Sequence, residues 1–565
     1  KRVSNYCHIN NICFIATSTY GLYGYAFSDF GEQFKISDTT GENPRSGIIC
    51  GLQLLKNNDN VVDDKIYLQI DTDPDVKHGL NESDKITLSG IKCLNGLPQR
   101  QHDSQKDDKN IFSIIPIVNE MKNADTGEVE RKIISQTSFK IDITSYNIEP
   151  NETWVKNTSG GYWNEVKQHE IIKHQSFNDA IEESDQPSSQ QQLPSFVQTD
   201  LIDFSKPMKL HSFLKALLIF ETKYNRCTIP GNVEDARKIT TLAMEEFKKY
   251  DENINNDDND VVEKKKTEKL YMSLALGASG QLSPMAAFFG GIVGQEVVKA
   301  CSGKYVPLNQ WLHFESSTSL PRLWSKEEGV VYIEEQVKPT GSRYDGQIAV
   351  FGKDFQNKLA NSSIFLVGSG ALGCEFMKNF AMIGIGCKNN NGNNGKIHVT
   401  DMDTVEVSNL NRQFLFRDYD VGQMKSTVAV KSISNINKNT NAIPHVVKVA
   451  PETENMFNDT FWEEIDIVVN ALDNVEARKY VDSRCSFYRK PLFESGTLGT
   501  KANVQPIIPS LTEGYSDGPN DQPEVDIPVC TLKSFPYMIE HTLAWAKEKF
   551  FTEFYEKPLQ SLTYM

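Results

Sequence analysis

Apolar runs of strand length alternate with amphipathic runs along the second half of the chain. The strand-length runs fall at 364–367, 396–403, 445–449 and 466–473, and runs with helical spacing fall at 371–384, 425–437 and 475–488. An order of strand, helix, strand, helix is typical of a mostly parallel sheet with helices on both faces. The pattern therefore predicts a doubly wound, Rossmann-like α/β domain within a multidomain α/β chain.

The first half of the chain is patterned differently. An apolar run at 11–16 predicts a buried strand, and a turn-rich segment follows it. Between 33 and 170, short alternating segments at 65–70, 85–91 and 112–118 favour a small β domain. The polar stretch 184–192 has the composition of a linker or an exposed loop.

Helical spacing begins at about residue 207. Apolar residues recur at intervals of three and four in 211–224 and 236–250, and the acidic stretch 251–260 after them indicates a solvated loop. The next helix, 284–300, is nearly apolar, so we expect it to be buried, with Gly290 and Gly291 allowing close backbone packing. A loop from about 521 and an amphipathic helix at 542–554 come last, and the chain looks like a piece of a longer protein.

Charge and cysteine content narrow the class of protein. The 565 residues, enough for roughly three to five domains, carry a net charge of -16 without a basic run, which argues against a nucleic-acid binder. No apolar run is long enough to span a membrane. The ten cysteines form no CxxC pair, which disfavours a zinc ribbon and suits a reducing compartment, so we expect a cytoplasmic and nuclear protein. Cys374 and Cys485 fall on helices expected to pack on the sheet, and Cys301 follows the apolar helix.

A glycine loop follows the first strand of the predicted sheet. Gly368, Gly370 and Gly373 lie between the apolar strand and the helix that begins at Ala371. Glycines at this spacing permit a tight turn and let a phosphate approach backbone N–H groups at a helix N-terminus. The loop alone predicts a nucleotide site, for which NAD or FAD is the default ligand.

Charged residues after the neighbouring strands change that default. Asp401 is placed to accept hydrogen bonds from a ribose, and Asp403 adds a second hard oxygen ligand that suits Mg²⁺. Arg412 and Lys425 follow, and two cations beside the ribose acid suit a triphosphate better than a dinucleotide. Asp473 projects at the end of the fourth strand, so Asp403 and Asp473 could share one magnesium ion.

These motifs together resemble one enzyme family. The segments GSGALG, TDMDTVEVSNLNRQFLF, NALDNVEARKYVD, ESGTLGTKANVQ and IPVCTLKSFP resemble the active adenylation half of the ubiquitin-activating enzymes, almost unbroken from about 343 to 565. The stretch from Ser279 to Glu315 resembles the end of the family's inactive adenylation half. FSDFGE and DFSKPMKLH resemble the borders of its first catalytic-cysteine half-domain and its four-helix bundle. The middle of the chain, about 50–190, matches weakly.

The resemblance implies a role for each matching residue. It places Gly368, Gly370, Ala371 and Gly373 in the nucleotide loop and Asp401 on the ribose, with Val449 lining the adenine pocket. It implies that Asn409, Arg412 and Lys425 contact the triphosphate and that Gln413 also belongs to the nucleotide site. Asp403 and Asp473 would hold Mg²⁺, and Cys530 would take the ubiquitin-like protein as a thioester. In the family an arginine near the N-terminus also reaches the phosphates of ATP, and from the resemblance we expect this chain to begin after it.

The resemblance also divides the chain into domains. It implies part of an inactive adenylation half at 1–32 and the rest of that half at 276–340. Between them it implies a β-rich first catalytic-cysteine half-domain at 33–170 and a four-helix bundle at 171–275. An active adenylation domain at 341–520 and the start of a catalytic-cysteine domain at 521–565 complete the division.

The function implied is ATP-dependent adenylation of ubiquitin, then thioester formation and transfer to ubiquitin-conjugating enzymes, by a monomer. The nearest alternative keeps this chemistry and changes the cargo to another ubiquitin-like modifier. An NAD- or FAD-dependent oxidoreductase fits the glycine loop but not the Arg412/Lys425 and Asp403/Asp473 sets. A non-catalytic scaffold is the third possibility. From cysteine chemistry alone Cys530 is more often a small buried hydrophobe than a nucleophile, so its assignment depends on the resemblance.

Overall fold

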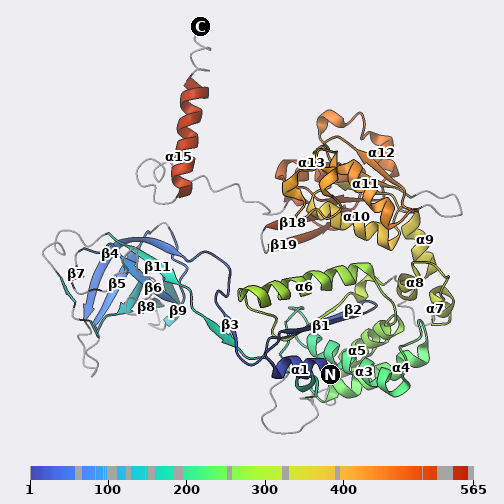
Figure 1. The fold of residues 1–565 in the computed structure, drawn as a ribbon, viewed down its shortest axis with the longest axis horizontal. Coiled ribbons are helices and arrows are strands. Elements are labelled where there is room, and N and C mark those ends of the chain that lie inside the picture. Colours follow the sequence, from blue (N-terminus) through green and yellow to red (C-terminus); the bar gives the residue numbers. More distant parts are fainter. Residues whose placement is uncertain are drawn as a thin grey trace. The chain divides into compact units, whose positions relative to one another are not determined.

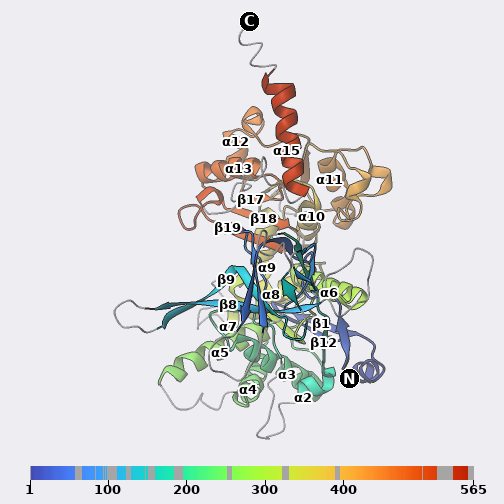
Figure 2. The ribbon, with the colours of Figure 1, turned by 90° about the vertical axis from the view of Figure 1, so that its left-hand side faces the viewer.

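The computed structural model falls into two compact units, which are described separately (Figures 1 and 2). One unit comprises 1–31, 174–297 and 307–524, and the other comprises 32–173, 298–306 and 525–565. The structure describes residues 2–56, 66–74, 76–82, 84–92, 94–95, 97, 111–122, 129–146, 148–150, 160–182, 195–250, 258–320, 330–387, 395–498, 501–517 and 539–557. None of the helices in these ranges is long and apolar enough to cross a membrane.

The second unit contains a closed β-barrel, drawn in blue to cyan in Figure 1. Its strands are β4 (Ser46–Lys56), β5 (Ile66–Thr72), β6 (Lys85–Ser89), β8 (Phe112–Lys122), β9 (Val129–Asp142) and β11 (Tyr162–Val166), in the order β11-β4-β5-β9-β8-β6. Leu68 and Ile70 alternate into the barrel core, as expected for strands with one buried face. The shorter pairs are β3 (Phe34–Ile36) with β12 (Glu170–Ile172) and β7 (Leu94–Asn95) with β10 (Glu149–Pro150).

A three-stranded antiparallel sheet brings distant parts of the first unit together. Its strands are β1 (Phe14–Tyr20), β2 (Tyr23–Asp29) and β13 (Trp311–Glu315), with β2 in the centre. The prediction of a buried strand at 11–16 was wrong in place and burial, since β1 is half-exposed and β2 is buried along its whole length. Glycines and tyrosines made β2 look like turns, and only its central position in the sheet explains the burial.

Helices cover this sheet. They are α1 (Arg2–Ile9), α2 (Phe177–Glu182), α3 (Lys206–Tyr224), α4 (Val233–Lys248), α5 (Asp258–Leu276) and α6 (Ser283–Ser302). Phe213 and Leu217 of α3 lie in one core cluster with Tyr23 and Phe27 of β2 and with Tyr271 of α5.

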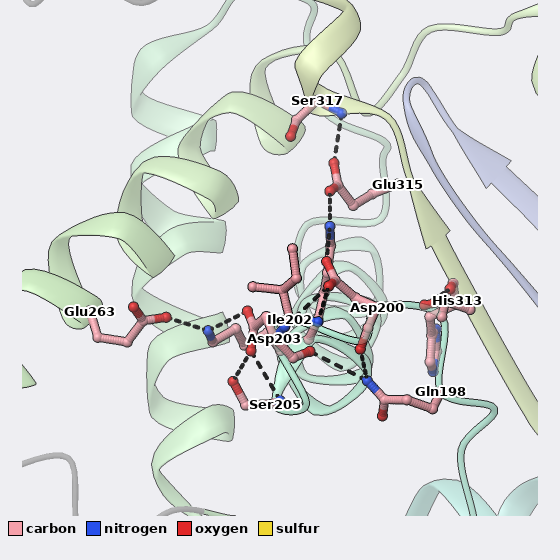
Figure 3. A network of polar contacts seen from close by, with 12 residues as sticks. Gln198, Asp200, Ile202, Asp203, Ser205, Glu263, His313, Glu315 and Ser317 are labelled. Carbon is pink, nitrogen blue, oxygen red and sulfur yellow. Dashed lines mark hydrogen bonds and ion pairs between the residues drawn. The ribbon is translucent and has the colours of Figure 1, made fainter. Parts of the chain in front are cut away.

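Ion pairs fix the start of α3 (Figure 3). The ammonium group of Lys206 lies 2.8 Å from a carboxylate oxygen of Glu315 in β13 and 3.2 Å from one of Asp200. Lys209, almost fully buried, contacts Asp203 at 2.9 Å and Glu263 of α5 at 2.6 Å. The predicted helices at 211–224 and 236–250 are thus confirmed within α3 and α4, with α3 anchored to both β13 and α5.

The prediction that the apolar helix at 284–300 is buried was wrong. In α6 only Met285, Phe289 and Glu296 are buried, and no atom of the described chain lies within 4 Å of a Cβ built on Gly290 or Gly291. The helix meets the sheet along one side, where Phe289 lies against Gly24. The apolar composition of a helix does not determine how many of its sides are covered by the rest of the protein. Cys301, near the end of α6, is exposed as well.

The second half of the first unit is the predicted α/β domain. Its six strands have the order β16-β15-β14-β17-β18-β19, and only β19 is antiparallel to its neighbour. Their bounds are β14 (Ile364–Val367), β15 (Ile397–Thr400), β16 (Ala442–His445), β17 (Ile467–Asn470), β18 (Leu492–Leu498) and β19 (Lys501–Ile507). The third predicted strand, 445–449, was misplaced, because β16 ends at His445 and the apolar residues after it lie in a loop.

Side chains of β14 alternate between two helical layers. Ile364 and Leu366 pack with α10 (Ala371–Ile383) and α11 (Lys425–Ile436), whereas Phe365 and Val367 pack with α12 (Asp459–Glu464) and α13 (Val475–Tyr488). Two buried faces explain why the strand is apolar at every position. Cys374 and Cys485 lie in these layers and are buried, as predicted.

The remaining helices are α7 (Val330–Val337), α8 (Asp345–Phe351), α9 (Lys353–Asn361) and α15 (Ile539–Phe551). The last of these confirms the helix predicted near the C-terminal end. Of the acidic stretch 251–260, residues 251–257 lie outside the described residues, and 258–260 form the start of α5. The polar stretch 184–192 also lies outside the described residues, as does most of the Asn- and Gly-rich segment 387–396 between α10 and β15.

Candidate functional site

The site lies where the strand order of the sheet reverses. β15 and β16 extend from one side of β14, and the next strand in sequence, β17, pairs with its other side. Ligands of open α/β sheets bind at such a switch point, outside the carboxyl ends of the strands. The glycine loop after β14 therefore lies between Asp401–Asp403 after β15 and Asp473 after β17.

The glycine loop is as tight as the sequence predicts. Gly368 has a φ of 101°, in the region that favours glycine, and a Cβ built on it would lie 2.4 Å from the carbonyl oxygen of Ala471. A Cβ on Gly373 would lie 2.4 Å from the carbonyl oxygen of Gly368. A Cβ on Gly370 meets nothing closer than Gln413, at 3.9 Å. Gly368 and Gly373 are thus required by the fold, and the surface at Gly370 stays open at the start of α10.

Asp401 holds the loop in place. One carboxylate oxygen accepts a hydrogen bond from the backbone N–H of Ser369 at 2.7 Å, and the other accepts one from Asp403 at 2.9 Å. Burial of the carboxyl group is the largest effect on it and raises its pKa above the ordinary value. Each oxygen keeps a second lone pair, so the group can still accept hydrogen bonds from a ligand hydroxyl.

The predicted cations do not share one environment. Lys425 begins α11 and is buried, and its ammonium group lies 2.9 Å from the Asp403 carboxylate, of which 59% is exposed. Arg412 is exposed, and its guanidinium group donates to the Ser408 carbonyl and the Asn411 side chain, both at 3.1 Å. The guanidinium group can therefore move toward a ligand, while the ammonium group is held at the end of β15.

Asn409 and Gln413 occupy the turn before α11. Asn409 ends a short 3₁₀ segment, and its side-chain oxygen accepts a hydrogen bond from Glu406 at 3.0 Å. Gln413 is 4% exposed, and its backbone N–H donates to the Asn409 carbonyl at 2.9 Å. These bonds hold the turn together, and the Gln413 side chain lies 3.9 Å from a Cβ built on Gly370 of the glycine loop.

Three buried polar atoms at this edge have no hydrogen-bond partner among the described residues. They are the hydroxyl oxygen of Ser369 and the side-chain oxygens of Gln413 and Asn470. Unpartnered buried polar atoms cost free energy in an empty site and are the usual sign of a polar ligand or ordered water. The Ser369 hydroxyl can donate to a phosphate oxygen, whereas the two amide oxygens accept and suit ligand hydroxyls or ordered water.

The two expected metal ligands lie on either side of β14. Asp473 is exposed, and within the described part of the chain its carboxylate has no hydrogen-bond or ion-pair partner. Asp403 shares its carboxylate with Lys425. No group of three or more His, Cys, Asp or Glu side chains in the described ranges could hold a metal by itself. A divalent cation here would therefore need oxygen ligands from phosphates as well.

Val449, predicted to line an adenine pocket, is 7% exposed and packs in the cluster that contains Phe365 and Phe457. Cys530 lies outside the described residues. Cys374 is a poor candidate for a nucleophile, because burial raises the pKa of its thiol to about 12. Sequence reasoning missed Ser369, Asn470 and a buried carboxylate at Glu494, since no spacing rule marks polar residues at the buried end of a strand.

Comparison with known proteins finds two family matches within the chain. Residues 344–550 match the ThiF family, and residues 168–255 match the family described as the ubiquitin-activating enzyme E1 four-helix bundle. The first match contains the whole glycine-loop site, and the second contains α3 and α4.

Curated relatives align along almost the whole chain. Ubiquitin-like modifier-activating enzyme 1 of Oryctolagus cuniculus is 40% identical over 549 residues, covering 97% of this chain and 45% of the relative. Ubiquitin-activating enzyme E1 1 of Candida albicans is 41% identical over 560 residues, covering 99% and 48%. The protein of that name in Arabidopsis thaliana is 39% identical over 548 residues, covering 97% and 44%. The chain spans about half the length of the curated relatives it matches, and along that span it is similar to ubiquitin-activating enzymes.

Proposed function

We propose that this chain adenylates the C-terminus of ubiquitin with ATP and then carries the ubiquitin as a thioester for transfer to ubiquitin-conjugating enzymes. The observation that carries the proposal is the switch-point site, where an open surface at Gly370 adjoins the unpartnered Ser369 hydroxyl at the start of α10. A buried carboxylate and two cations accompany it. A dinucleotide site would not need Lys425 and Arg412 beside the acid that holds the ribose.

In this proposal each predicted residue contacts one part of ATP. Asp401 accepts hydrogen bonds from the ribose, and Val449 lines the adenine. The nucleotide loop is formed by Gly368, Gly370, Ala371 and Gly373, and the triphosphate is contacted by Asn409, Arg412, Gln413 and Lys425. The helix N-terminus at Ala371 adds backbone N–H groups that favour an anion.

Asp403 and Asp473 would hold Mg²⁺ between them and the phosphates. Asp473 fits because its carboxylate is exposed and uncommitted, and Asp403 fits because more than half of it is exposed beside Lys425. When bound, the ion offsets negative charge on the phosphate oxygens as pyrophosphate leaves.

The chemistry needs few protein groups. The C-terminal carboxylate of ubiquitin attacks the α-phosphorus of ATP. The bond from the α-phosphorus to the oxygen that bridges it to the β-phosphorus breaks, and pyrophosphate leaves. Lys425 and Arg412 stabilise the charge that develops on the leaving group. The acyl-adenylate is already activated, so the Cys530 thiolate attacks its carbonyl carbon, a thioester forms and AMP leaves.

The domain division is part of the proposal. Pairing of β13 with β2 joins residues near 14–29 to 311–315, which supports one inactive adenylation half built from 1–32 and 276–340. The half-domain at 33–170 and the bundle at 171–275 are inserted in it, and the active domain at 341–520 leads into the cysteine domain at 521–565. We further propose a monomer, cytoplasmic and nuclear, whose partners are ubiquitin and conjugating enzymes and neither nucleic acid nor membrane.

Exchange of pyrophosphate into ATP tests the first step. The chain should catalyse ATP–pyrophosphate exchange that depends on added ubiquitin, and a panel of other ubiquitin-like modifiers identifies the cargo if ubiquitin is inactive. An NAD- or FAD-dependent oxidoreductase would show no exchange with any of them.

Thioester formation tests the second step. A ubiquitin adduct should form on the wild-type chain, disappear with dithiothreitol and be absent from Cys530→Ala, while exchange persists in that variant. An adduct that resists dithiothreitol, or none at all, contradicts the assignment of the nucleophile.

A further inference from the structure

A buried carboxylate lies beneath the segment that carries Asp473. Glu494, in β18, is 0% exposed. One of its oxygens accepts a hydrogen bond from the Asn470 amide at 2.6 Å, and the other accepts one from the backbone N–H of Ser495 at 3.0 Å. A carboxylate in such a place needs a cation, because desolvation of an unpaired charge is expensive.

Arg478 supplies that cation and also binds the backbone next to Asp473. Its Nε lies 3.3 Å from the Glu494 carboxylate, close enough for an ion pair but not aligned as a hydrogen bond. A second nitrogen of the guanidinium, Nη2, donates to the carbonyl oxygen of Leu472 at 2.7 Å. Leu472 directly precedes Asp473, so the guanidinium joins a buried carboxylate to the backbone beside the exposed one.

The segment 471–473 is held on its other side by the glycine loop. The backbone N–H of Ala471 donates to Val367 at 2.8 Å, and its carbonyl oxygen is the atom that a Cβ on Gly368 would strike. The backbone of Gly496 lies close to Arg478, since a Cβ there would be 3.1 Å from Nη2. A side chain larger than hydrogen at 496 would press on the guanidinium group.

We infer that Arg478 and Glu494 are positioning residues, which fix the 471–473 backbone so that the Asp473 carboxylate is preorganised for a divalent cation. The inference rests on the proposed function, because it concerns how the cation of that site is held. A buried ion pair is weak evidence for a purely stabilising role, since apolar replacements of such pairs are often neutral. The bond to the Leu472 carbonyl gives this pair a specific task.

The test measures ATP binding by calorimetry on the full chain, once with Mg²⁺ and once with EDTA. In the wild type Mg²⁺ should tighten ATP binding. In Arg478→Ala that gain should shrink by about tenfold, the usual scale of a lost preorganising contact, while the affinity in EDTA stays within about twofold.

Matched variants control for folding. Arg484 lies on the same helix and pairs with Glu454 at 3.4 Å, so Arg484→Ala removes an arginine of α13 away from the segment and should behave as wild type. Arg478→Ala leaves Glu494 buried without its cation, and Arg478→Lys is therefore measured as well. Lysine keeps the charge but offers one nitrogen for two partners, so the loss should be smaller and in the same direction.

A double-mutant cycle with Asp473→Asn completes the design. Arg478→Ala should add no further loss of the Mg²⁺-dependent gain in that background, because both changes act on one carboxylate. An unchanged gain in Arg478→Ala, or an equal loss with Mg²⁺ and with EDTA, overturns the inference while the proposed function stands. A wild-type chain that binds no ATP in either condition overturns both.

Discussion

Replacing Gly370 with alanine should separate ligand binding from folding, because two glycines of the same loop have different surroundings. A methyl group on Gly368 would lie 2.4 Å from a backbone oxygen, and its φ of 101° is strained for alanine. A methyl group on Gly370 would find its nearest neighbour at 3.9 Å, at an ordinary contact distance from the flexible Gln413 side chain. Gly370→Ala is therefore accommodated by the protein and obstructs only an incoming phosphate.

The magnitudes follow from these contacts. For Gly368→Ala, left-handed strain of about 1–2 kcal/mol adds to overpacking of about 1–3 kcal/mol. We expect a loss of about 2–5 kcal/mol of local stability in total, out of the 5–15 typical of a domain. Gly370→Ala should change stability by less than about 1 kcal/mol. Loss of a backbone contact to a charged phosphate should weaken ATP binding by about 1.5–3 kcal/mol, roughly tenfold or more.

Hydrogen exchange reports the first quantity and calorimetry the second. The amides of Gly368 and Ala471, which donate to Thr400 and Val367, should exchange at least roughly tenfold faster in Gly368→Ala. In Gly370→Ala they should keep their protection. Local exchange is preferable to a melting temperature here, because a chain with two compact units need not unfold in one step.

Two results would refute the reasoning. If Gly370→Ala binds ATP within about threefold of the wild type, phosphate does not approach this face of the loop. If Gly368→Ala keeps the protection of both amides, the close approach of the loop to the end of β17 does not limit the residue at 368. A variant that loses both properties at Gly370 would mean that the open surface there is needed for folding.

The remaining predictions concern charge. Lys425→Met should lower the rate of ATP–pyrophosphate exchange by roughly 10²–10³, and should cost at most about 1 kcal/mol of stability because Asp403 is largely exposed; Lys378→Met, which breaks a surface pair on α10, is the control, and a loss of exchange below tenfold contradicts the phosphate role. Burial lowers the pKa of His313 to about 3 and that of His211 well below its usual 6.5, so the unfolded chain binds more protons as the pH falls through 6.5 toward 3. Stability of the α3 region, followed by hydrogen exchange, should therefore fall with pH across that window, and His313→Gln should flatten the dependence; a pH-independent protection would show that these rings are not buried as described.

The sequence determined the local elements and the order of the α/β domain. The alternation of strand and helix periods, the glycines at 368, 370 and 373, and acids placed after strands follow from short-range rules. They are found where expected, except that the strand predicted at 445–449 lies at 442–445. It did not determine which segments are covered. The helix around Gly290 has the composition of a buried helix and is largely exposed, while Tyr23–Asp29 resembles a turn and is buried throughout.

The tertiary structure decided which side chains meet. Asp401 supports the glycine loop, Lys425 is held by Asp403, and Arg478 joins Glu494 to the segment before Asp473. These pairings join residues from 6 to 32 positions apart in the chain, in different strands, helices and loops. A linear pattern carries the period of an element but not the register in which two elements lie side by side, and that register sets every distance within the site.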